Sequence, residues 1–457
     1  MGKLNLTRRE MLLGAGAMAG VAAAAPMARS QAAAPVDAGT RASKKLPDVG
    51  AETRAERMKW WHEAKFGMFI HFGTYATIMR KEWDLEMEAI PTAEYVEHAK
   101  TFRPGKDSPR AWAKLAKKAG MKYMVLTTKH HEGFCNWDTK LTDYNIVKQG
   151  AGFDLVREYV DAVRAEGLKV GFYYSLMDWH HPDGAKCATD EAARRRFVDY
   201  THGLLRELMT NYGTIDVLWY DVAWPLDAAG WESVKMNEMV YGLQPKIIIN
   251  NRNKLPGDFS TPEQKIEATE RGRAWESCMT LNGSWGFCRA DDEWKTPRTV
   301  VRNLITCVRD DGNYLLNIGP KPDGSIPAET TSILTEVGAW LARNGEVLAA
   351  NDPCAVTRSN YALFSRKGNT LYMHVALWVG DYVAIGGLKT KVKSARLLRT
   401  GKAVAFEQDD WRVKLTGLPA YGAAPDTPLV TIALECEGEP VQDEDHVRRE
   451  KPRAATA

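Results

Sequence analysis

The sequence lacks a large excess of charge of either sign. Its 457 residues include 61 Lys and Arg against 58 Asp and Glu, a formal net charge of +3. Residues 1–35 contain four basic side chains and one acidic side chain, so they carry the whole excess. A nucleic-acid-binding protein needs a surplus of basic residues to neutralise phosphates. The neutral body of this chain therefore excludes DNA and RNA as expected partners.

Two kinds of binding motif are also missing. The seven Cys residues are widely spaced and contain no CxxC pair. Their spacing excludes the usual zinc-binding pattern and a disulfide scaffold, and we expect mostly buried free thiols, with one disulfide as the alternative. Neither GxGxxG nor GxxxxGK followed by Ser or Thr comes after the first expected strand. The nucleotide-binding variants of an α/β fold are therefore disfavoured.

Long apolar runs are absent beyond the N-terminal region, so no other segment is expected to cross a membrane. Residues 7–13 carry a twin arginine, Arg8-Arg9, and a short apolar stretch rich in Ala and Gly follows over 11–26. Residues 1–35 resemble a bacterial twin-arginine signal peptide, with an uncleaved anchor as the alternative. We expect a periplasmic or secreted protein without membrane contact after cleavage.

The chain from about residue 54 to 345 alternates short apolar runs with amphipathic stretches. Strands buried on both faces are expected at 66–73, 123–129, 169–175, 217–222, 246–252, 275–280 and 314–319. Helices are expected at 92–100, 109–119, 154–166, 191–211, 231–242 and 297–310. Repeated βα units predict an α/β fold with a (β/α)8-like (TIM-type) catalytic barrel over residues 50–348. A doubly wound open sheet is the alternative.

The pattern changes after residue 350. Short strands separated by Gly, Asn and Asp turns are expected at 361–365, 370–376, 382–385, 394–398, 411–414 and 429–434. They predict a small C-terminal antiparallel β-sandwich over residues 352–437. Residues 438–457 are charged and rich in Pro and Ala, and we expect them to form a loose tail.

Polar residues gather where the expected barrel strands end, the face that carries the active site of such barrels. They are His71, His130, His131, Tyr173, Asp221 and Arg252. Asp221 closes an otherwise apolar strand, which is where a carboxylate nucleophile or base would lie. Its alternative role is capping of the following helix.

A retaining glycosidase needs a second carboxylate about 5–5.5 Å from the first. The candidates are Glu63, Glu82, Glu132, Glu263, Glu267, Glu270 and Glu276. Glu263 lies in a loop beyond the fifth strand, on the same face as Asp221. Glu276 begins a strand and should point to the barrel floor or interior, so a buried structural acid paired with Arg is its alternative role.

Aromatic side chains are unusually concentrated in the barrel half. Twelve of the 15 Trp residues lie between Trp60 and Trp294. Near strand ends, an indole offers a flat surface for the C–H face of a pyranose, although core packing is the alternative for each. These residues are Trp83, Trp137, Trp179, Trp224 and Trp285.

The adjacent His130 and His131 point to opposite faces of a regular strand. This arrangement suits hydrogen bonds to sugar hydroxyls better than ligation of one zinc ion.

Seven segments together resemble the α-L-fucosidases of glycoside hydrolase family 29, and they occur in the order found in that family. They are 60–73 (WWHEAKFGMFIHFG), 127–134 (TTKHHEGF), 173–175 (YYS), 219–221 (WYD), 275–280 (WESCMT), 284–287 (SWGF) and 313–320 (NYLLNIGP). The chain departs from the family pattern at Glu132, usually Asp, at Phe72, often Trp, and at 81–84 (KEWD), usually Glu-Trp-Tyr.

The resemblance implies an exo-acting retaining enzyme that hydrolyses terminal α-L-fucose from fucosylated glycans. By analogy Asp221 is the nucleophile and Glu263 the acid/base, with Glu276 and Glu270 as alternatives because this position varies in the family. The family contacts to the fucose hydroxyls or the nucleophile match His71, Trp83, His130, His131, Tyr173 and Arg252, and Trp285 matches an aromatic near the sugar methyl. No metal or cofactor is required.

Two other classes of function stay open at this point. One is a metal-dependent barrel hydrolase that uses the His pairs, and the other is a non-catalytic sugar-binding protein on a degenerate barrel. The sequence also leaves open the fucosyl linkage, the aglycone and the oligomeric state, and it is compatible with a homo-oligomer.

Overall fold

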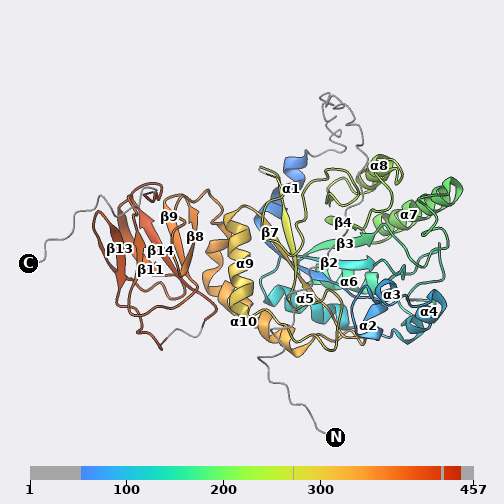
Figure 1. Ribbon diagram of the computed structural model, residues 1–457, viewed down its shortest axis with the longest axis horizontal. Coiled ribbons are helices and arrows are strands. Elements are labelled where there is room, and N and C mark those ends of the chain that lie inside the picture. Colours follow the sequence, from blue (N-terminus) through green and yellow to red (C-terminus); the bar gives the residue numbers. More distant parts are fainter. Residues whose placement is uncertain (1–52, 271, 424–426, 444–457) are drawn as a thin grey trace, which may run out of the picture. The chain divides into compact units, whose positions relative to one another are not determined.

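The computed structural model describes residues 53–270, 272–423 and 427–443. The twin-arginine signal expected at residues 1–35 lies outside the described residues. Seven parallel strands form one sheet in the order β5-β4-β3-β2-β1-β7-β6 (Figure 1). Their bounds are β1 (Phe66–Ile70), β2 (Tyr123–Lys129), β3 (Lys169–Ser175), β4 (Val217–Asp221), β5 (Ile248–Ile249), β6 (Glu276–Thr280) and β7 (Asn313–Ile318). The sheet and its covering helices confirm the TIM-like α/β class.

Alternate residues of each strand face two different cores. Phe69, Tyr173, Trp219 and Leu315 belong to a cluster inside the curled sheet. Their strand neighbours pack instead in the larger cluster between the sheet and the helices. Because side chains alternate along a strand, a sheet covered on both faces needs apolar residues at nearly every position. This explains the continuous apolar runs of the sequence.

The two edges of the sheet, β5 and β6, are joined by an irregular segment. Isolated parallel bridges pair Asn250 with Phe259, Ser260 with Trp275, and Glu263 with Cys278. The strand expected at 246–252 is reduced to β5 because the side-chain amide of Asn250 bonds the backbone N–H and C=O of Tyr220, both at 2.9 Å. Residues 259–263 therefore lie between β5 and β6 and close the barrel wall.

Helices cover the outside of the sheet, with α6 against β2 and β3 and α9 against β7 (Figure 1). They are α1 (Arg54–Ala64), α2 (Tyr75–Ile78), α3 (Asp84–Met87), α4 (Thr92–Thr101), α5 (Ser108–Lys118), α6 (Leu155–Ala165), α7 (Glu191–Asn211), α8 (Ser233–Leu243), α9 (Pro297–Arg309) and α10 (Ala328–Asn344). The helices α1 to α3 and α10 were not among those expected. Helix α1 packs Met58 and Trp61 into the inner cluster and so fills the barrel floor.

The C-terminal region forms two antiparallel sheets, β11-β14-β9-β8 and β10-β13-β12. The strands are β8 (Ala362–Lys367), β9 (Thr370–Val375), β10 (Val383–Gly386), β11 (Val392–Leu397), β12 (Ala405–Gln408), β13 (Arg412–Thr416) and β14 (Val430–Cys436). Residues from both sheets, among them Met373, Ile385, Val413 and Ile432, share one core. The prediction of an antiparallel C-terminal unit is confirmed, with β12 added.

The loose tail expected over 438–457 is wrong for its first residues. Gln442 is buried, and its side-chain oxygen accepts the backbone N–H groups of Thr357 and Arg358 at 3.0 Å each. Because a buried amide needs hydrogen-bond partners, the Gln442 side chain fixes the segment around residue 442 to the start of the β-sandwich. Residues 444–457 lie outside the described residues.

The expectation of mostly buried free thiols is met within the described chain. All seven Cys residues are described, none is in a disulfide, and five of them are buried. None of the described helices combines the length and the apolar character needed to cross a bilayer.

Candidate active site

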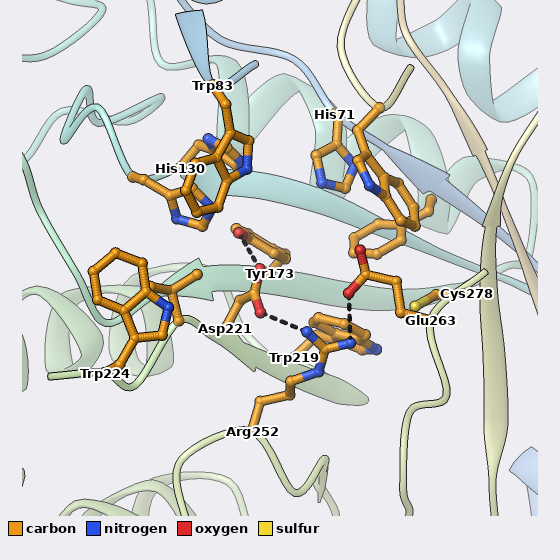
Figure 2. Close-up of a pocket in the computed structure, with 14 residues that line it drawn as sticks. His71, Trp83, His130, Tyr173, Trp219, Asp221, Trp224, Arg252, Glu263 and Cys278 are labelled. Atoms are coloured by element: carbon orange, nitrogen blue, oxygen red, sulfur yellow. Dashed lines mark hydrogen bonds and ion pairs between the residues drawn. The ribbon is translucent and has the colours of Figure 1, made fainter. Parts of the chain in front are cut away.

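A cavity of about 210 Å³ opens at the carboxyl ends of the barrel strands (Figure 2). Its lining residues are Phe69, His71, Trp83, His130, His131, Tyr173, Trp219, Asp221, Val222, Trp224, Arg252, Glu263, Cys278 and Trp285. The two carboxylates Asp221 and Glu263 and all seven residues matched to substrate binding are in this set. Segments that are distant in the sequence thus meet at one place, as the barrel topology requires.

A single guanidinium connects the two carboxylates. Arg252 Nη1 lies 2.9 Å from Asp221 Oδ1, and Arg252 Nη2 lies 2.9 Å from Glu263 Oε2 (Figure 2). The hydroxyl of Tyr173 donates to the other oxygen of Asp221, Oδ2, at 2.8 Å. Both oxygens of Asp221 are therefore held in place by donors from other strand ends. The side chain of Asp221 therefore binds Tyr173 and Arg252 and does not cap the following helix, which was its alternative role.

The Arg252 side chain is itself well supported. Its Nε donates to Thr261 Oγ1 at 2.9 Å, and its Nη2 donates to the Thr261 carbonyl at 3.2 Å. The guanidinium carbon lies 4.9 Å from the centre of the Trp219 ring. Because Thr261 belongs to the irregular segment 259–263, Arg252 joins this segment to β4 and so sets the relative position of the two carboxylates.

Two histidines of the cavity have defined tautomers. Asn317 Nδ2 donates to the Trp285 carbonyl, so Asn317 Oδ1 must accept from His71 Nδ1, at 2.7 Å. Ser175 Oγ donates to the Met177 carbonyl, so it accepts from His131 Nδ1, at 2.8 Å. Both rings then keep Nε2 as an acceptor.

Both histidines are fully buried, and burial holds the pKa of His71 and of His131 well below the ordinary value. They are therefore neutral at ordinary pH. A neutral ring with a free Nε2 accepts a hydrogen bond from a hydroxyl group. The site thus presents two buried acceptors to a polyol.

His130 and His131 do not point to opposite faces, because β2 ends at Lys129 and neither histidine belongs to a regular strand. Their ring centres lie 3.8 Å apart and both rings line the cavity. His130 Nδ1 lies 3.5 Å from the buried carboxylate oxygen Glu132 Oε2. Glu132, at a position where the family usually has Asp, therefore contacts the cavity residue His130 from outside the cavity.

The other two acid/base candidates lie elsewhere. Glu270 is exposed and does not line the cavity. Glu276 is fully buried at the floor of the barrel, where Trp219 Nε1 donates to Oε1 at 3.1 Å and Trp61 Nε1 and the Tyr123 hydroxyl donate to Oε2. Glu276 is thus a structural acid as its alternative role states, but its partners are two indoles and a phenol instead of Arg.

Glu276 has a consequence for stability, because burial raises its pKa from the ordinary 4.5 to about 7. The folded state binds the carboxyl proton of Glu276 more tightly than the unfolded state does. The contribution of this proton to the free energy of unfolding is therefore fully present below pH 4.5 and is lost as pH rises through 7. At one pKa unit per 1.36 kcal/mol, the loss is about 3 kcal/mol. We expect urea unfolding of Glu276→Gln to lack this decline between pH 4.5 and 7.5. Wild-type and variant curves that run parallel over this range would contradict the expectation.

Several lining residues lie within the recognised motifs but are not among the site residues expected from the sequence, among them Phe69, Trp219 and Cys278. Phe69 and Trp219 precede His71 and Asp221 by two positions, so the strand period of two places each pair on the same face. Applying this period to the strand ends would have found them. Trp137, in contrast, is a core residue, since it is buried and donates to Glu207 Oε2 at 3.0 Å. Within the described ranges, no three His, Cys, Asp or Glu side chains are grouped so that they could hold a metal ion.

Comparisons with known proteins agree with the resemblance found in the sequence. A family model described as Alpha-L-fucosidase matches residues 34–346. Tissue alpha-L-fucosidase from Bos taurus is 31% identical over 351 residues, which cover 70% of this chain and 75% of that protein.

Solved structures give the same result. Alpha-L-fucosidase isoenzyme 1 from Paenibacillus thiaminolyticus is 40% identical with a TM-score of 0.77, and the match covers 84% of this chain and 99% of that one. An alpha-L-fucosidase of family GH29 from Bacteroides thetaiotaomicron is 28% identical with a TM-score of 0.75, covering 84% and 96% of the two chains. That structure is a trapped covalent intermediate obtained with 2-fluoro-fucosyl fluoride in a Glu-to-Gln mutant.

Proposed function

This chain belongs to the alpha-L-fucosidase family of retaining glycoside hydrolases, and we propose that Asp221 and Glu263 perform its double displacement on fucosylated glycans. The observation that carries these roles is the guanidinium of Arg252, which holds one oxygen of each carboxylate at 2.9 Å in the same cavity. Neither Glu270 nor Glu276 lines this cavity.

In the first step, Asp221 attacks the anomeric carbon of the terminal fucose while Glu263 protonates the departing glycosidic oxygen. A covalent fucosyl-enzyme forms and the remaining glycan leaves. In the second step, Glu263 removes a proton from water, the water attacks the anomeric carbon, and Asp221 is released. Two inversions give net retention of configuration.

The surrounding residues orient the reactants. Arg252 and Tyr173 bond both oxygens of Asp221, which limits the rotation of the nucleophile. The neutral His71 and His131 rings accept hydrogen bonds from fucose hydroxyls through Nε2. Trp83 and Trp285 supply apolar surfaces for the ring and its methyl group.

A direct test of the proposed function follows the first product by NMR. With an aryl α-L-fucoside as substrate, we expect α-L-fucose to appear first and the β-anomer to grow in later by mutarotation. The same assay with aryl galactosides and glucosides should show far slower turnover. Initial release of β-L-fucose, or no release of fucose, would contradict the proposal.

We also propose that the enzyme is exported by the twin-arginine route and acts in the periplasm or outside the cell. The support is the Arg8-Arg9 pair, followed by the short apolar stretch over 11–26 and small residues near position 32. We expect the double variant Arg8→Lys, Arg9→Lys to retain its fucosidase activity in the cytoplasm and to lose export. Export of this variant at the wild-type level would contradict the route.

A further inference from the structure

Trp224 is the aromatic residue at the mouth of the catalytic cavity. It lines the cavity, yet 47% of its surface is exposed, whereas Phe69, Tyr173 and Trp219 in the same lining are 2% exposed or less. Figure 2 shows Trp224 and Glu263 on opposite sides of Asp221. The side chain of Glu263 is also exposed, at 43%. These two residues therefore mark where the cavity meets solvent.

The backbone that carries Trp224 is held in an unusual conformation. Val222, which directly follows the proposed nucleophile, has φ of 42°. A β-branched residue rarely adopts a positive φ, and it does so only where its surroundings enforce the conformation. This turn redirects the chain immediately after β4, so that Trp224 reaches the cavity mouth three residues beyond Asp221.

Hydrogen bonds hold each of the three residues before Trp224. The carbonyl of Asp221 accepts from Leu176 N at 2.9 Å, and that of Val222 accepts from Met177 N at 3.2 Å. The carbonyl of Ala223 accepts from the indole of Trp231. Trp224 is therefore presented on a fixed segment, and a fixed aromatic surface loses little conformational entropy when a ligand covers it.

The Trp224 ring also continues an aromatic wall that starts inside the cavity. Trp83 lies 5.0 Å from His131 between ring centres, and Trp224 lies 6.4 Å from Trp83 with the ring planes inclined by 35°. Trp179 supports Trp83 from the side at 5.1 Å. The aromatic wall therefore runs from His131, which is expected to bind the fucose, out to the solvent.

We propose that Trp224 forms the subsite for the sugar ring that carries the fucose. The inference rests on the proposed function and names the partner that the same site recognises outside the fucose pocket. A cavity of about 210 Å³ is below the range of about 300–1,000 Å³ typical of sites for larger ligands, and suits one monosaccharide. The next ring of the glycan then lies at the mouth, where its C–H face stacks on the exposed indole.

The test compares two substrates that differ only in what the fucose is attached to. A fucosylated disaccharide places a pyranose on Trp224, whereas α-L-fucosyl fluoride has no second ring. For Trp224→Ala we expect the ratio of kcat/KM for the disaccharide to kcat/KM for the fluoride to fall about 10-fold, mainly through KM. Trp224→Phe keeps a flat ring and should restore most of the ratio. A panel of disaccharides with different linkages shows which glycan the subsite prefers.

The matched control is Trp411→Ala, which removes a similarly exposed indole, 42% accessible, from the loop before β13, and should leave the ratio at the wild-type value. A wild-type ratio in Trp224→Ala with every disaccharide would overturn the inference, whether both kcat/KM values stay unchanged or both fall equally. A wild-type enzyme that hydrolyses neither substrate would instead overturn the function on which the inference rests, and the inference with it.

Discussion

Asp221→Ala is expected to lose at least ~10³-fold in kcat on an aryl α-L-fucoside and to regain turnover when azide is added. Without the carboxylate no fucosyl-enzyme forms, so the first displacement has no nucleophile. The shortened side chain leaves room for azide beside the anomeric carbon. Azide attacks once, with inversion, and the product is β-L-fucosyl azide.

The surroundings of Asp221 make this variant interpretable. Its side chain is held at the cavity surface by Arg252 and Tyr173 and is not part of either apolar cluster. We therefore expect the variant to fold. Asp227→Asn is the matched control, because Asp227 is exposed in the same loop and its side chain accepts the backbone N–H of Gly230. Wild-type turnover by Asp221→Ala, or α-L-fucosyl azide as its product, would contradict the nucleophile assignment.

Glu263→Ala is expected to show the second largest effect, and its size should depend on the leaving group. Loss of a general acid costs about 10²–10⁴-fold for a sugar leaving group, which needs a proton to depart. Fluoride and nitrophenolates leave with little help, so fucosyl-enzyme should still form from them and accumulate. Azide then attacks this intermediate, and the product is the retained α-L-fucosyl azide.

The two variants thus give opposite anomers of the same azide, which separates the two roles without reference to rate. Glu270→Ala is the control for the second, because Glu270 is exposed and does not line the cavity. An equal loss for good and poor leaving groups in Glu263→Ala would contradict the acid/base assignment. So would a larger loss in Glu270→Ala.

The sequence predicted the regular parts of the fold well, because local pattern determines them. The expected strands at 123–129 and 169–175 and the helix at 191–211 coincide with β2, β3 and α7. Each is a long, strongly patterned run, and Asp190 at the N-cap accepts Ala193 N and so marks the start of α7. The strand expected at 246–252 failed because a side-chain amide, that of Asn250, replaces the ladder, which no periodicity reveals.

The residues of the site were reached through sequence motifs, and the structure adds how they interact. That Arg252 bridges Asp221 and Glu263 depends on the segment 259–263 closing the barrel, a long-range pairing that local pattern does not encode. The tautomers of His71 and His131 depend on Asn317 and Ser175, which are ordinary strand residues in the sequence. The proposal of Glu263 over Glu270 and Glu276 as the acid/base likewise draws on the spatial arrangement, since all three follow β5 within 27 residues of Ile249.

The central claim is that a fucosyl group becomes covalently attached to Asp221. The most direct measurement is inactivation of the wild-type enzyme with 2-deoxy-2-fluoro-α-L-fucosyl fluoride, followed by intact-mass analysis and peptide mapping. The electron-withdrawing fluorine slows both steps and the activated leaving group favours the first, so the intermediate accumulates. We expect one fluorofucosyl group per chain, on the peptide that contains Asp221. Label on Glu263 or another residue, or an inactivated enzyme without covalent label, would contradict the account.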